Sequence, residues 1–161
     1  MTHPVEKLIY QEARLLDQGL LDDWLALYTP QATYWVPIDE HVDPLQESSI
    51  IFDNHLRLQM RVEQIMRQAR VAQNPSSYML RMISNLELET LCDDRVIARF
   101  AMLLTEVRSG DWRQQGLGTL RQLPAHCELE AVHVDGVWKI DRKKIVLLNR
   151  KQPIFGLSFI I

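Results

Sequence analysis

One set of residues could together carry out acid–base catalysis: Tyr34, Asp53, His55 and Arg142. A carboxylate or imidazole can abstract a proton, and a phenol or guanidinium can stabilise the charge that develops, so this set needs no cofactor. A strongly curved sheet would bring the four together at the mouth of a cone. Asp53 directly precedes a helical pattern, however, where a carboxylate commonly caps the helix. We favour capping for Asp53 and keep acid–base catalysis as the alternative.

Histidine and cysteine, the usual ligands of transition metals, are scattered along the chain. A Rieske cluster needs paired Cys-x-His segments, and a mononuclear ferrous site needs two histidines and a carboxylate. Neither spacing occurs among the five histidines and two cysteines: His3, His41, His55, His126, His133, Cys92 and Cys127. We therefore predict no metal on this chain.

The sequence also gives no support for a phosphate-binding loop, a nucleic-acid-binding surface or a catalytic nucleophile. Gly116-x-Gly118 neither follows a predicted strand nor opens a helix, so it is no phosphate cradle. The net charge of −3 disfavours binding to nucleic acid, and no serine or cysteine stands in a nucleophile motif. With no signal peptide, no long apolar run and no disulfide pattern, we expect a cytoplasmic protein that does not contact a membrane.

The elements that must position the polar residues begin with three helices. Apolar residues recur at three- and four-residue steps from Val5 to Leu16, after Thr2 as the expected cap and before Gly19 as a stop. A second short helix is expected from Asp22 to Tyr28. A third follows from the helical spacing of apolar residues between Leu58 and Ala69.

The remainder favours strands. We expect a strand at Thr33–Val36, an acidic loop at 38–50, a break at 74–77 and a polar connection at 111–118. Period-2 patterns predict four more strands, the last two joined by an Asp135-Gly136 turn: Tyr78–Glu89, Arg95–Arg108, Cys127–Val134 and Val137–Leu148. Helices first and strands second predict one α+β domain over 1–161, with the helices packed on a curved antiparallel sheet.

The segment Gln152–Ile161 contains apolar residues and no charged side chain. Terminal segments that fray are ordinarily polar, so we expect this one to pack. Its own sheet and a second chain are equally good candidates for the surface that it covers.

Ordered motifs along nearly the whole chain resemble the small (β) subunit of bacterial aromatic-ring-hydroxylating, Rieske-type dioxygenases. They are Glu12-Ala-Arg-Leu-Leu-Asp17, Trp24-Leu-Ala-Leu-Tyr28, Tyr34-Trp-Val-Pro37, Arg61-Val62, Pro75-Ser-Ser77, Ile83-Ser-Asn85, Trp138-Lys-Ile140, Arg142 and Leu147-Leu-Asn149. The first and third are closest to benzoate- and anthranilate-type members.

The resemblance implies the cone-shaped fold of nuclear transport factor 2, scytalone dehydratase and ketosteroid isomerase. It also implies a structural chain without catalytic, cofactor or metal residues. The Rieske iron–sulfur cluster and the mononuclear iron would lie on a large (α) subunit, in an assembly of three large and three small subunits. The small subunit alone would form trimers.

We choose Arg57, Arg61, Arg81 and Asn85 as residues that would contact the large subunit, because an arginine near other polar groups often anchors an interface. Two alternatives stay open. One is a stand-alone, cofactor-free isomerase, dehydratase or cyclase that uses the cone; the other is a plain protein-binding cone.

Overall fold

The computed structural model describes residues 1–72, 77–108, 120–154 and 159–161. Within these ranges, three helices and six strands follow one another: α1 (Pro4–Asp17), α2 (Leu21–Leu25), β1 (Tyr28–Pro37), β2 (Ser49–Asn54), α3 (His55–Ala72), β3 (Tyr78–Cys92), β4 (Arg95–Val107), β5 (Leu120–Val134) and β6 (Val137–Leu147). The expected break at 74–77 and the connection at 111–118 fall largely or wholly outside the described residues.

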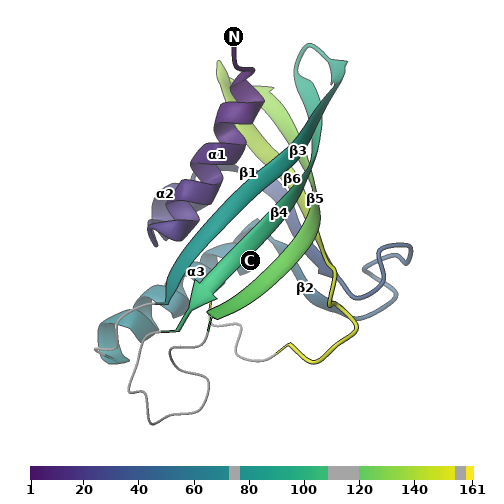
Figure 1. The fold of residues 1–161 in the computed structure, drawn as a ribbon. Coiled ribbons are helices and arrows are strands. Elements are labelled where there is room, and N and C mark those ends of the chain that lie inside the picture. Colours follow the sequence, from purple (N-terminus) through teal and green to yellow (C-terminus); the bar gives the residue numbers. More distant parts are fainter. Residues whose placement is uncertain (73–76, 109–119, 155–158) are drawn as a thin grey trace.

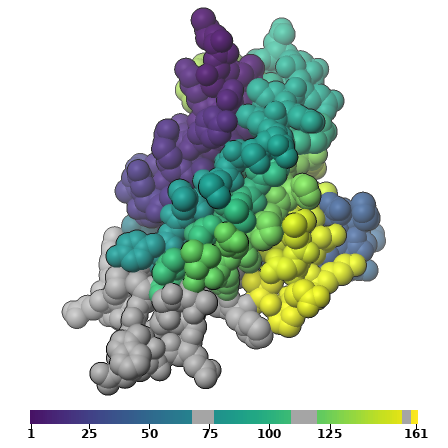
Figure 2. Space-filling model, viewed as in Figure 1, coloured from purple at the N-terminus to yellow at the C-terminus, as the bar shows by residue number. Residues whose placement is uncertain are grey.

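The six strands form one sheet in the order β2-β1-β6-β5-β4-β3. Neighbours run antiparallel except β1 and β6, which are parallel. α1 contacts β3 and β6, α2 lies between α1 and α3, and α3 contacts β1 and β2 (Figure 1). α1 packs directly against β3, as the space-filling view also shows (Figure 2). This confirms the α+β fold class, a curved sheet with helices on one face.

The first helix ends as the sequence predicts but begins differently. The side chain that caps α1 is His3, whose Nδ1 accepts from Val5 N at 3.1 Å, and not Thr2. Gly19 adopts a left-handed φ of +70°, and the Leu20 N–H reaches back to the Leu15 carbonyl at 2.9 Å. Asp135 and Gly136 both have positive φ, which confirms the hairpin turn between β5 and β6.

Strand β2 is an element that the sequence did not predict. Its last four residues, 51–54, lie between the expected loop and the expected helix, and the strand is only six residues long. β2 pairs with β1. Because β1 already begins at Tyr28, the second helix is shorter than expected and ends at Leu25. Such short segments carry too few residues for periodicity to separate strand from helix.

A bulge in each of two strands changes which side chains face the helices. In β3 the pairing shifts between Ser84 and Glu87, around Asn85 with its φ of +53°. In β6 the shift leaves Asp141 as the extra residue, since Glu130 pairs with Arg142 and Ala131 with Ile140. One extra residue reverses the alternation beyond it.

The core lies between the helices and the concave face of the sheet. Strand β4 shows the alternation most regularly, burying the five residues Val96, Ala98, Phe100, Met102 and Leu104. Its other face is less buried, although the apolar run from Val96 to Leu104 by itself predicts a strand that is buried on both faces. The segment Phe159–Ile161 belongs to the same core.

Candidate functional site

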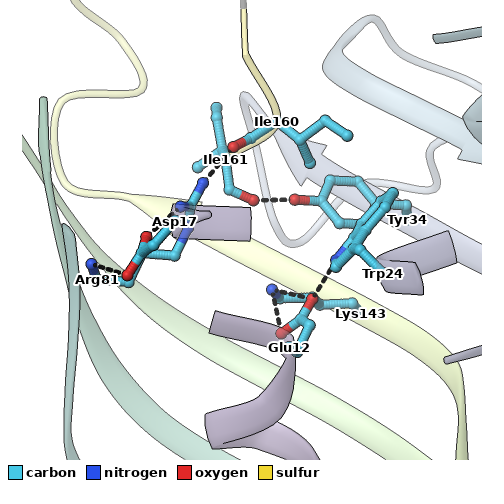
Figure 3. Close-up of polar contacts among 8 residues, drawn as sticks. All are labelled: Glu12, Asp17, Trp24, Tyr34, Arg81, Lys143, Ile160 and Ile161. Carbon is cyan, nitrogen blue, oxygen red and sulfur yellow. Dashed lines mark hydrogen bonds and ion pairs between the residues drawn. The ribbon is translucent and has the colours of Figure 1, made fainter. Parts of the chain in front are cut away.

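A buried ion pair lies at the centre of the cone, between α1 and β6 (Figure 3). Lys143 Nζ lies 2.6 and 2.8 Å from the two carboxylate oxygens of Glu12. Trp24 Nε1 and the Tyr28 hydroxyl donate to the same carboxylate at 3.2 and 2.7 Å. All four residues are at most 4% exposed. The charge on each side chain is therefore balanced inside the protein.

The surroundings keep Glu12 ionised and the two tyrosines neutral. Burial by itself would raise the pKa of the Glu12 carboxyl, but the Lys143 charge and the four hydrogen bonds hold that pKa below its ordinary value. Burial, followed by the Glu12 charge, raises the pKa of Tyr28 and of Tyr34 well above 10.0. Both phenols therefore act as hydrogen-bond donors and not as bases.

The segment Phe159–Ile161 fills the space next to this pair. The Tyr34 hydroxyl donates to the Ile161 backbone oxygen, and Arg81 Nη2 donates to the Ile160 carbonyl (Figure 3). Arg81 also binds Asp17 on α1 through Nη1 at 2.6 Å and through its backbone N–H at 3.0 Å. The two candidate surfaces were expected for the whole of Gln152–Ile161, of which residues 155–158 lie outside the described part. The described end, Phe159–Ile161, lies against the chain's own sheet.

The four residues with acid–base character do not form one catalytic group: His55 is the half-buried first residue of α3, and the other three are each bound to another group of this chain. Asp53 is 5% exposed and forms an ion pair with Arg61, whose Nε and Nη2 both lie 2.8 Å from Oδ2. Tyr34 lies beside Asp53 in the β1–β2 pairing, but its hydroxyl is bound to Ile161. Arg142 faces outward and binds Glu128 at 2.5 Å, because the bulge at Asp141 separates it from inward-facing Ile140.

Asp53 is also not the cap of the third helix. The side chain of Asn54 has that role, since its Oδ1 accepts from Arg57 N at 2.9 Å. Asp53 belongs to β2, where strand alternation turns it toward the interior and toward Arg61. The capping interpretation was therefore wrong by one residue.

The four residues chosen for a subunit interface occupy different environments. Arg57 is exposed on α3, and Arg61 is partly exposed beside Asp53. Asn85 is exposed in the β3 bulge. Arg81 is 6% exposed and bound within this chain. Their contact with another subunit stays a prediction.

Glu12 and Lys143 are the residues that sequence reasoning missed. Glu12 carries a signal, because it stands four residues before Leu16 on the apolar stripe of α1, where a carboxylate needs a buried partner. No comparable sequence signal marks Lys143. Regular alternation from Ile140 would direct its side chain outward, and only the bulge directs it toward the core.

Among the described residues, no group of three or more His, Cys, Asp or Glu side chains is arranged to hold a metal ion. Within the same residues, no helix is both long and apolar enough to cross a membrane.

Comparison with known proteins shows the family. Residues 11–152 match the family model described as the ring hydroxylating beta subunit. The chain belongs to this family. Its match to the β subunit of benzoate 1,2-dioxygenase from Acinetobacter baylyi (strain ATCC 33305 / BD413 / ADP1) is 33% identical over 102 residues, 60% of each chain. Other relatives are small or β components of p-cumate, 2-halobenzoate and toluate dioxygenases, and the chain spans 48 to 62% of the length of these four relatives.

Solved structures show the same fold. The β subunit of benzoate 1,2-dioxygenase from Burkholderia mallei ATCC 23344 superposes with a TM-score of 0.78 and 24% identity, covering 99% of this chain and 100% of that one. A putative scytalone dehydratase from Novosphingobium aromaticivorans DSM 12444 gives a TM-score of 0.66 and 14% identity, covering 89% of this chain and 81% of that one. These likenesses confirm the fold that the resemblance implied, and the family match confirms the resemblance itself.

Proposed function

We propose that this β-family chain is the non-catalytic, structural subunit of a multicomponent aromatic-ring-hydroxylating dioxygenase. The family match over residues 11–152 is the observation that carries the proposal. In this proposal the chain provides no catalytic residue and binds no cofactor. The Rieske cluster and the mononuclear iron lie on a large subunit, which this chain holds in the assembly.

The interior supports a structural function. Each polar side chain at the centre of the cone is used to join elements: Glu12 and Lys143 join α1 to β6, and Asp17 and Arg81 join α1 to β3. Asp53 and Arg61 join β2 to α3. A stand-alone isomerase, dehydratase or cyclase would need one of these groups directed at a substrate, and no observation favours that alternative.

The outer face supports association with another subunit. Tyr78, Leu80 and Met82 form a β3 apolar row whose members are 70, 57 and 51% exposed. Apolar residues of β4 adjoin the row on the same face, because Met82 lies opposite Leu103 and Tyr78 lies opposite Val107. Exposed apolar patches of this kind mark protein–protein contacts.

For the assembly we propose three large and three small subunits in the cytoplasm, and a trimer for the small subunit alone. We also propose that residues 1–161 form a single domain. The substrates we propose are aromatic carboxylates, on the support of the relatives named for benzoate and toluate.

Co-expression with a large subunit encoded beside this chain tests the function. Light scattering should give the mass of a three-plus-three assembly, and the assembly should consume oxygen with benzoate when its electron donors are supplied. The large subunit alone serves as the control. A folded small subunit that stays monomeric and fails to co-purify with any large subunit would refute the proposal.

A further inference from the structure

The segment Phe159–Ile161 lies in the cone in the way that a ligand would. Its exposed fractions are 7, 2 and 0%, so each of its side chains is enclosed by the rest of the protein. Three different strands contact the three residues. The Arg121 guanidinium of β5 lies 5.4 Å from the centre of the Phe159 ring, Arg81 of β3 binds the Ile160 carbonyl, and Tyr34 of β1 binds the Ile161 oxygen.

The cations around the segment are already balanced by carboxylates of the chain. Arg81 pairs with Asp17 at 2.6 Å, Lys143 with Glu12 at 2.6 Å, and Arg121 with Glu106 at 2.6 Å. Among the described residues, the site therefore has hydrogen-bond donors but no excess positive charge, and we do not expect it to select an anion. Two of its polar atoms, Arg81 Nε and Glu106 Oε1, are buried without a hydrogen-bond partner among the described residues.

We propose that the interior of the cone is a binding site for a short, neutral, apolar peptide, and that Phe159–Ile161 occupies it as an intramolecular ligand. The apolar walls of the core hold the side chains. Arg81 and Tyr34 donate to successive main-chain oxygens, which fixes the direction of the peptide. This proposal does not depend on the subunit function proposed above.

The direct test uses the chain without residues 159–161. Calorimetry should show saturable binding of the acetylated tripeptide amide Phe-Ile-Ile, with a Kd between about 1 µM and 1 mM, as expected for an apolar ligand of this size. Tyr34→Phe in the shortened chain should weaken that binding roughly fivefold, because one hydrogen bond is lost. The peptide Phe-Asp-Ile, with a carboxylate in the middle, should not bind.

Benzoate is the competing probe, because a cone selective for small acids would bind it. Binding of benzoate without binding of the tripeptide would overturn the proposal, and so would a folded shortened chain that binds neither.

A second measurement on the complete chain decides the matter if the shortened chain fails to fold. Hydrogen exchange at the amides of residues 160 and 161 should be at least about tenfold faster than at the amides of β4 and β5, since a docked ligand leaves without global unfolding. Tyr34→Phe should accelerate exchange at residues 160 and 161 alone. Exchange of all these amides at one common rate in both proteins would show that the segment is inseparable from the core, contrary to the proposal.

Discussion

The carboxylate of Glu12 and the ammonium of Lys143 lose their hydration together when the chain folds. Each is at most 1% exposed, and desolvation of an ion in a protein interior costs several kcal/mol. The pair is tolerated because Trp24 and Tyr28 satisfy further lone pairs of the carboxylate. Removal of one charge from this buried pair should therefore cost much more folding stability than removal of one charge from an exposed ion pair.

Lys143→Met should therefore destabilise the protein by about 3–5 kcal/mol, because it leaves the Glu12 carboxylate buried without a counter-charge. The double variant Glu12→Leu/Lys143→Met should be less destabilised than Lys143→Met. Urea unfolding at pH 7 measures both. Arg67→Met is the matched control, since it breaks the exposed Glu63–Arg67 pair and should cost less than about 1 kcal/mol. A double variant less stable than Lys143→Met would contradict this account.

The buried thiol of Cys127 gives a pH dependence on the alkaline side. Burial raises the pKa of Cys127 from 9.0 to about 12. Since the folded state holds the proton more tightly, this contribution to stability is complete below pH 9 and is lost as the pH rises toward 12. Between pH 9 and 10.5 the loss should be about 1.5 kcal/mol.

Unfolding in urea at pH 8, 9 and 10.5 should show a loss of stability that is about 1.5 kcal/mol larger in the natural chain than in Cys127→Ala, because the loss that comes from the raised pKa of Tyr28 and of Tyr34 is common to both. Cys92→Ala is the control, because Cys92 is exposed and its removal should leave the alkaline loss unchanged. If the free energy of unfolding fell with pH equally steeply in the natural chain and in Cys127→Ala, the buried Cys127 thiol would not be the source of the alkaline loss.

At the scale of elements, the two bulges decide which residues face the core. Before Asn85, the even-numbered residues of the β3 apolar row face outward. After the bulge, the odd-numbered Glu87 faces outward and lies opposite Arg99. In β6 the bulge brings Lys143 to the same face as Ile140. Since side chains alternate along a strand, a single inserted residue exchanges the two faces.

Asn85→Val should destabilise the protein by about 1–3 kcal/mol, because a β-branched residue is strained at a φ of +53°. Asn85→Gly should stay within roughly 0.5 kcal/mol of the natural chain, since glycine adopts this conformation freely. Thermal or urea unfolding gives both values. Ser84→Val, on the exposed residue before it, is the control and should also change stability by less than about 0.5 kcal/mol. Equal losses for the two valine variants would show that backbone strain is not the cause.

At the scale of the whole molecule, the helices and the segment Phe159–Ile161 fill the concave face of the sheet, while part of the convex face stays apolar and exposed. The interior thus stabilises the chain itself, and the β3 apolar row is available to another chain. This division is what a structural subunit requires.

Leu80→Asp should weaken association with the large subunit or among small subunits at least about tenfold, because it places a carboxylate inside the proposed contact. Sizing at a series of concentrations measures the change. Leu45→Asp, at a residue 83% exposed outside the row, should leave association unchanged. Circular dichroism should show both variants folded, as the replaced side chains are exposed. Unaltered association of Leu80→Asp would remove the β3 apolar row from the interface.

The sequence by itself determined the first and third helices, the hairpin at Asp135-Gly136, the α+β class and the family. These follow from local periodicity, from turn residues that tolerate positive φ, and from the order of motifs along the chain. Only the tertiary structure decided how polar residues far apart in sequence are paired. Glu12 and Lys143 lie 131 residues apart, and Tyr34 and Ile161 lie 127 apart. Their contacts depend on a bulge, a parallel strand pair and a folded-in segment, none of which leaves a periodic signal in the residues that form it.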